Sequence, residues 1–141
     1  MFGNYNNWVI RPFSSNEFAP KDLYVPPGET LVVLGYPQGY YDSIHNLPIA
    51  LGVFLASDYR VPFEDKQYFL VNGNLQPGNS GSPVLNTSPN LRVVRGSTFI
   101  YLSPPLLLGI YSGPLRLPKE EECGKTYLNI VWFPRLIDEI I

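Results

Sequence analysis

The protein has 141 residues, of which 45% are hydrophobic and 16% charged, so it has enough chain for one buried core and little for a second domain. Ten basic and twelve acidic side chains leave a formal net charge of −2 without a block of either sign, which disfavours nucleic acids and anionic membranes as partners. No apolar run approaches the roughly 20 residues that cross a bilayer, and residues 1–15 lack the pattern of an export signal; we expect a soluble protein and leave its compartment open.

The chain is punctuated by turn-forming residues. Fifteen prolines and twelve glycines separate short apolar runs, and the sequence contains ten tyrosines and eight phenylalanines. Aromatic and β-branched residues suit pleated, half-buried strands better than helices. We therefore expect an all-β protein.

The N-terminal part reads differently from the rest. Trp8–Phe13 is a short strand candidate, and residues 14–30 are a proline-containing connector. A connector of this length is unusual inside a compact domain and more natural between two packed units. We therefore predict that residues 1–30 join an earlier unit to a domain formed by residues 31–141.

Six apolar runs with the length of strands follow the connector. A helix is expected at residues 134–141, where a proline precedes apolar residues spaced along one face, and residues 87–105 are expected to form an inserted loop or hairpin. We predict a six-stranded antiparallel β-barrel with a short C-terminal helix. The strands are expected at Leu31–Tyr36, Ile49–Ala56, Gln67–Asn72, Ser82–Leu85, Leu106–Ser112 and Leu128–Phe133.

The segment Leu75–Val84, with the sequence LQPGNSGSPV, is the most informative. A serine hydroxyl is a weak nucleophile, and a site that uses one needs backbone N–H groups directed at the oxygen that becomes negative. A glycine at position 78 is able to take backbone angles denied to other residues, so its amide and that of Ser80 could converge beside the Ser80 hydroxyl. The same residue types also form ordinary structural turns. A nucleophile elbow of the α/β-hydrolase type does not fit, because Ser82 stands where that motif needs glycine.

Four segments in chain order resemble those of the trypsin-like, chymotrypsin-fold serine peptidases. Gly78–Val84 resembles the nucleophile motif in its bacterial glutamyl endopeptidase form, and Leu34–Gly39 resembles the Gly-Tyr/Phe-Pro-x-Gly strand end of the family. Asn46–Ser57 and Leu108–Gly113 resemble the next strand and the wall of the specificity pocket. The resemblance implies peptide-bond hydrolysis through an acyl-enzyme, with Ser80 as nucleophile, the amides of Gly78 and Ser80 as oxyanion donors, and no cofactor.

The resemblance also implies a substrate side. It places Asn74 at the base of the pocket, with Tyr111, Ser112 and Gly113 on its wall; Pro77 and Ile110 are assigned to the substrate side as well. No charge is expected there, so a polar or small apolar side chain is favoured over lysine or arginine. The strand from Ile110 to Gly113 would pair with an extended peptide. A turn role for Asn74 and a packing role for Tyr111 remain the alternatives.

The base and the acid of the catalytic triad are harder to place. The complete fold of the family has two barrels and carries histidine and aspartate on the first, whereas this chain resembles the second barrel alone. The strand beginning at Trp8 resembles the one that follows the catalytic aspartate, which puts Asn7 at the position of the acid. In a trypsin-like enzyme that change lowers kcat by about 10⁴-fold, because the histidine is held in the wrong tautomer.

His45 is the only histidine, and Asp42 lies three residues before it. A local triad of Asp42, His45 and Ser80 is one hypothesis; a solvated loop histidine beside a turn aspartate is the other. A single histidine and the single cysteine, Cys123, do not make a metal cluster. We expect neither metal nor cofactor.

Three functions therefore stay open. The chain is the nucleophile-bearing half of a peptidase and nearly inactive alone, or a non-catalytic peptide-binding pseudo-peptidase, or a structural half-barrel that assembles with a partner. The expected partners are a peptide or protein substrate and, against the uncovered barrel face, a first-barrel chain or a second copy.

Overall fold

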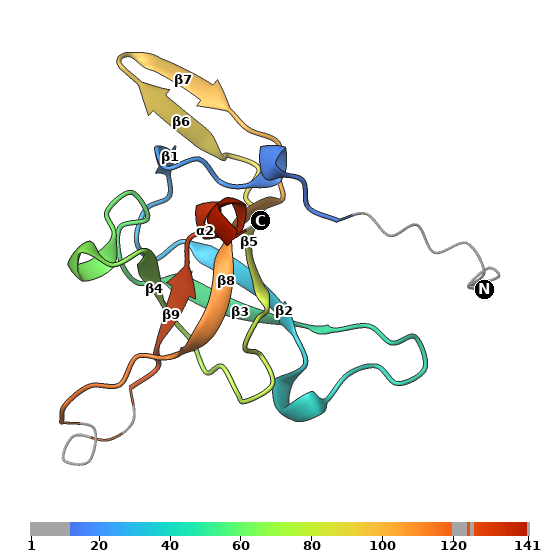
Figure 1. The fold of residues 1–141 in the computed structure, drawn as a ribbon. Coiled ribbons are helices and arrows are strands. Elements are labelled where there is room, and N and C mark those ends of the chain that lie inside the picture. Colours follow the sequence, from blue (N-terminus) through green and yellow to red (C-terminus); the bar gives the residue numbers. More distant parts are fainter. Residues whose placement is uncertain (1–11, 120–123, 125, 141) are drawn as a thin grey trace.

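The computed structural model describes residues 12–119, 124 and 126–140. Its main feature is a closed antiparallel barrel with strand order β2-β3-β4-β9-β8-β5, in which β5 pairs back onto β2 (Figure 1). The barrel strands are β2 (Thr30–Gly35), β3 (Ile49–Leu55), β4 (Tyr68–Asn72), β5 (Pro83–Asn86), β8 (Leu106–Pro114) and β9 (Leu128–Trp132). The all-β class and the six-stranded barrel are confirmed, with strand ends within one or two residues of those expected.

The barrel interior is filled by alternate residues of each strand, because successive side chains of a strand point to opposite faces. Leu31 and Val33 of β2 are fully buried, and their neighbours in the strand are more exposed. An aromatic cluster closes one end of the core. In it Tyr59 meets Phe69 and Phe133 edge-to-face, with ring centroids 5.3 and 5.4 Å apart, a favoured geometry for aromatic pairs.

The C-terminal helix is also confirmed, as α2 (Arg135–Ile140). It follows the buried Phe133, and the Arg135 guanidinium lies 4.1 Å from the centre of that ring. Arg135 also donates a 2.7 Å hydrogen bond to the Gln67 side chain, which ties the helix to the segment before β4. No helix in the described part of the chain has both the length and the hydrophobicity of a membrane-spanning segment.

A second, three-stranded sheet of order β1-β6-β7 lies apart from the barrel, at the top of Figure 1. It combines β1 (Leu23–Tyr24) with β6 (Arg92–Arg95) and β7 (Thr98–Tyr101). The hairpin of β6 and β7 occupies the region that the sequence predicts as an inserted loop or hairpin. All four residues of the edge strand β7 are exposed.

Residues 14–30 pack closely against the barrel. Ala19, Leu23 and Val25 are buried within the same core cluster as the barrel strands, and the Ala19 amide donates a 2.8 Å hydrogen bond to the Leu107 carbonyl. This part of the expected connector is therefore integral to the domain core. The earlier strand candidate at Trp8, the residue Asn7 and Cys123 lie outside the described residues.

Candidate functional site

The loop between β4 and β5 carries Ser80, and a neighbouring turn fixes its shape. Gly78 has a φ of +97°, and a Cβ there would overlap the carbonyl oxygen of Tyr36 and lie 3.0 Å from the amide nitrogen of Gln38. The Gln38 amide in turn donates a 2.6 Å hydrogen bond to the Pro77 carbonyl. Glycine is therefore required at position 78 both for its backbone angle and for the close approach of the 3₁₀ turn Pro37–Gly39.

A buried asparagine supports the loop from inside. Asn79 is 0% exposed, and its side-chain amide donates a 3.1 Å hydrogen bond to the Gln76 carbonyl. Its side-chain oxygen, Oδ1, packs against Gly35 at the end of β2, and a Cβ added to Gly35 would overlap this oxygen. Gly35 thus makes room for the loop. Sequence reasoning missed both residues, although a glycine inside a strand signals a close approach by another segment.

The backbone amides around Ser80 divide into two sets. Those of Asn79, Gly81 and Ser82 donate to backbone carbonyls within the domain. Those of Gly78 and Ser80 donate to no acceptor in the described part of the chain. Because the Ser80 side chain is exposed, a bound group at its hydroxyl has two unpaired amides in the same short turn. Stabilisation of an oxyanion requires free backbone N–H donors of this kind beside the nucleophile.

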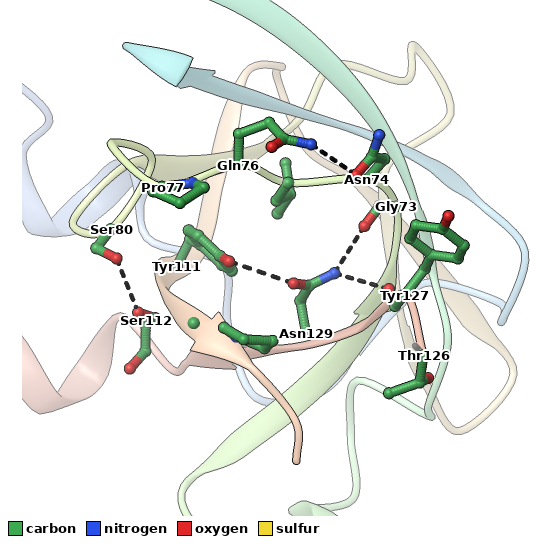
Figure 2. Close-up of a pocket in the computed structure, with 13 residues that line it drawn as sticks. Gly73, Asn74, Gln76, Pro77, Ser80, Tyr111, Ser112, Thr126, Tyr127 and Asn129 are labelled. Atoms are coloured by element: carbon green, nitrogen blue, oxygen red, sulfur yellow. Dashed lines mark hydrogen bonds between the residues drawn. The ribbon is translucent and has the colours of Figure 1, made fainter. Parts of the chain in front are cut away.

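Ser80 stands at the rim of a cavity of about 300 Å³ (Figure 2). Its hydroxyl donates a 3.1 Å hydrogen bond to the carbonyl oxygen of the neighbouring Ser112, which belongs to β8. Thirteen of the described residues line the cavity: Gly73, Asn74, Leu75, Gln76, Pro77, Ser80, Tyr111, Ser112, Gly113, Pro114, Thr126, Tyr127 and Asn129.

The structure brings most of the expected substrate-side residues together. Asn74, Pro77, Tyr111, Ser112 and Gly113 all line the cavity that Ser80 borders. Asn74 is exposed, and its Oδ1 accepts a 2.8 Å hydrogen bond from the side-chain amide of Gln76.

Ile110 is not among the lining residues. It is half-buried and lies within the barrel ladder, opposite Pro83 of β5 and Trp132 of β9. The part of β8 that borders the cavity begins one residue later.

The bottom of the cavity is polar, and its hydrogen bonds are satisfied. Tyr111 and Asn129 are each 3% exposed, and the Tyr111 hydroxyl donates a 3.2 Å hydrogen bond to Asn129 Oδ1. Asn129 Nδ2 donates to the carbonyl oxygens of Gly73 and Tyr127, at 2.8 and 2.7 Å, as Figure 2 shows. Burial raises the pKa of Tyr111, so its hydroxyl keeps its proton at neutral pH and remains the donor.

Sequence reasoning also missed Asn129. A signal was present, because Asn129 shares a strand face with Val131 in β9, and both are buried. A polar residue at an inward strand position needs partners from the surrounding segments.

Asp42 and His45 pair with each other in a different place. His45 Nδ1 lies 2.7 Å from Asp42 Oδ2, and Asp42 Oδ1 accepts from the amides of Ile44 and His45. The hydrogen bond from the His45 side chain is the main cause that lowers the pKa of Asp42. Neither residue lines the cavity, and the loop that carries them extends away from the barrel in Figure 1. The structure thus forms the acid and base pair but does not bring it together with Ser80.

Comparison with known protein families finds no family model that matches, and no curated protein matches the sequence either. The arrangement of Ser80, its unpaired amides and the cavity therefore carries the functional argument.

Proposed function

We propose that this chain is the nucleophile-bearing half of a trypsin-like serine endopeptidase, with Ser80 as the nucleophile. The observation that carries the proposal is the coincidence of three features in one turn: an exposed hydroxyl, two unpaired amides, and a cavity beside them. A structural turn would need neither the unpaired amides nor the cavity. The sequence resemblance of Gly78–Val84 to a nucleophile motif supports the same role.

The reaction follows from these groups. Ser80 Oγ attacks the carbonyl carbon of the scissile peptide bond, and the carbonyl oxygen becomes negative and accepts hydrogen bonds from the amides of Gly78 and Ser80. The hydroxyl proton passes to a base, which returns it to the leaving nitrogen as the C–N bond breaks. Water then hydrolyses the acyl-enzyme and regenerates Ser80.

The base is the group that the described residues do not supply at the cavity. No histidine, lysine or carboxylate is among the thirteen lining residues in the described part of the chain. Positioning and oxyanion stabilisation alone leave roughly 10³–10⁴-fold over water, so the isolated chain is a very weak enzyme. A first-barrel polypeptide or a second copy of this chain would supply the missing base.

The substrate backbone has a natural place beside the cavity. Pairing between β5 and β8 ends at Pro83 and Ile110, and β8 continues to Pro114. The edge from Ser112 onward is therefore open on the side of Ser80, and an extended peptide would add to it as a strand. Such pairing delivers the scissile carbonyl to the neighbouring hydroxyl.

A peptide-binding module without catalysis is the second candidate. It is favoured by the position of Asp42 and His45, which pair with each other rather than with Ser80. In that case the cavity and the open edge of β8 bind extended segments, and the Ser80 loop persists as a structural turn.

An experiment that adds a base from solution separates the peptidase half from the binding module. The chain is treated with a fluorophosphonate probe, with and without a high concentration of imidazole, and the modified residue is located by intact mass and peptide mapping. We expect slow labelling of Ser80 that imidazole accelerates, because free imidazole accepts the hydroxyl proton.

Ser80→Ala should abolish this labelling, and Ser97→Ala, an exposed serine in the turn of the β6–β7 hairpin, should leave it unchanged. Absence of labelling at Ser80 in folded protein, even with imidazole, would establish the binding module instead.

A further inference from the structure

We propose that the cavity beside Ser80 selects an uncharged, mainly apolar substrate side chain, aromatic or branched aliphatic, and that the Tyr111–Asn129 pair is its specificity-determining floor. The proposal deepens the proposed function, on which it rests for the position of this side chain next to the scissile bond. The preference for such a side chain in binding rests on the cavity alone and does not require catalysis. It also departs from the polar or small apolar side chain that the sequence favours.

Charge is the first criterion. Among residues 12–119, 124 and 126–140, the lining consists of glycine, proline, leucine, serine, threonine, tyrosine, asparagine and glutamine, without a charged side chain. An ion that enters such a cavity loses water without gaining a counter-ion, which costs several kcal/mol. Glutamate, aspartate, lysine and arginine are therefore rejected.

Hydrogen-bonding capacity is the second criterion. Both Asn129 Nδ2 protons are used by the carbonyls of Gly73 and Tyr127, and Asn129 Oδ1 already accepts from the Tyr111 hydroxyl. The floor therefore has no spare donor for a carboxylate or a side-chain carbonyl. A polar tip that reached the floor would lose hydrogen bonds to water without full replacement, whereas an apolar side chain loses none.

Size and shape are the third criterion. A volume of about 300 Å³ is at the lower end of the range of ligand pockets, which fits one large side chain better than a whole small molecule. Flat or apolar groups line the space, among them Pro114, and they extend from Pro77 on the Ser80 loop to Tyr127 on the far side in Figure 2. An aromatic or branched aliphatic side chain gains most from such walls, since its burial is favourable by about 1.5–3 kcal/mol.

The test uses peptide binding, so that it does not depend on catalysis. Four acetylated tetrapeptide acids, Ac-Ala-Ala-Pro-X with X as Phe, Leu, Glu or Lys, are titrated into the ¹⁵N-labelled chain and followed by amide chemical shifts. We expect the Phe and Leu peptides to bind at least about tenfold more tightly than the Glu and Lys peptides. The shifts should centre on Gly73–Gln76 and Ser112–Gly113. Equal affinities, a preference for Glu or Lys, or no binding of any peptide would overturn the proposal.

A pair of glycine variants locates the binding. A Cβ added at Gly113, which lines the cavity, or at Gly52, on β3 outside its lining, meets no atom within 4 Å. Both Gly113→Val and Gly52→Val should therefore fold. We expect Gly113→Val to weaken the Phe peptide at least about tenfold by narrowing the cavity, and Gly52→Val to bind as the unmodified chain does. Equal binding by the two variants would contradict the cavity as the site.

Two further variants separate the floor from the nucleophile. For Tyr111→Phe a fifth peptide, with X as Gln, is added. The variant leaves Asn129 Oδ1 without its donor, so the preference for the Phe peptide over the Gln peptide should shrink, because the Gln side-chain amide now finds an acceptor. A parallel weakening of all peptides would instead indicate a purely structural role. Ser80→Ala should keep the full side-chain preference. A preserved side-chain preference without fluorophosphonate labelling of the unmodified chain would refute Ser80 as the nucleophile but keep the cavity as the specificity site. Labelling of Ser80 without any side-chain preference would refute the cavity but keep the nucleophile.

Discussion

Two loops of this protein carry the residue types of a serine-peptidase site, and they are held in opposite ways. The Ser80 loop is fixed by distant segments: Gln38 binds Pro77, and the Tyr111 carbonyl accepts from Gly81. The loop of Asp42 and His45 is fixed by hydrogen bonds within its own segment, from Asp42 to Leu47. The local hydrogen bonds of the Asp42 loop only close a turn. The contacts of the Ser80 loop with segments on both sides determine which of its backbone amides remain unpaired. The contrast shows that the candidate site belongs to the barrel rather than to the loop sequence.

The largest effect is expected where the Ser80 loop approaches the neighbouring turn most closely, at Gly78. Gly78→Ala forces a side chain into a positive-φ position and onto the Tyr36 carbonyl, so we expect a loss of about 3 kcal/mol in the free energy of unfolding. Gly39→Ala is the matched control, because it also has a positive φ but an added Cβ meets nothing; a loss of about 1 kcal/mol is expected. Urea denaturation measures both. Equal losses would mean that strain alone, without the anchor at Tyr36, accounts for the requirement for glycine.

An intermediate effect is expected at the floor of the cavity, where Asn129 holds the start of the segment that leads to Ser80. Asn129→Ala leaves the carbonyls of Gly73 and Tyr127 and the Tyr111 hydroxyl without their partner, which costs about 2 kcal/mol of stability. The exposed Asn72→Ala, at the end of β4, should cost well under 1 kcal/mol. If Asn129→Ala were as mild as its control in urea unfolding, the hydrogen-bonded floor would not hold the loop.

The smallest effect is expected in the loop of Asp42 and His45. The His45 side chain lowers the pKa of Asp42, so the stability due to this pair is present above the unfolded-state pKa of the carboxyl and lost as the pH falls through the lowered, folded-state value. In His45→Gln we expect the Asp42 pKa, measured by carboxyl ¹³C titration, to rise toward its ordinary value. Imidazole-assisted labelling of Ser80 should not change. A drop in that labelling would show that the pair acts on Ser80 after all.

The barrel was readable from the sequence because its signals are local. Alternating apolar residues and flanking turn residues mark strands such as β2 and β4 without reference to the rest of the chain. The Ser80 loop was readable for a similar reason, since its glycines and serine lie in one short segment. The same holds for the cavity residues that flank Ser80 or lie on β8, although their common location came from the family resemblance rather than from the pattern.

What the sequence hid depends on contacts between distant segments. Asn79 and Asn129 are typical of surface or turn positions, but Asn79 is buried where its loop packs against Gly35 of β2, and Asn129 is buried where it binds the Gly73 carbonyl. Leu23 and Val25 lie in a proline-containing stretch that resembles a linker, and their burial depends on the barrel that forms afterwards in the chain. The distance of Asp42 and His45 from the cavity is likewise a property of where their loop extends.

The two anchors of the Ser80 loop also determine when it takes shape. Its partner Gln38 precedes it in the chain, and its partner at Tyr111 follows it. Closing both connections requires that β2 and β8 already flank β5, because loop-closure entropy must be overcome before such long-range contacts form. On a ribosome, the turn stays unformed until β8 has emerged. A nascent chain therefore carries Ser80 long before the candidate site exists, and the Ser80 loop takes its final shape only when the barrel closes.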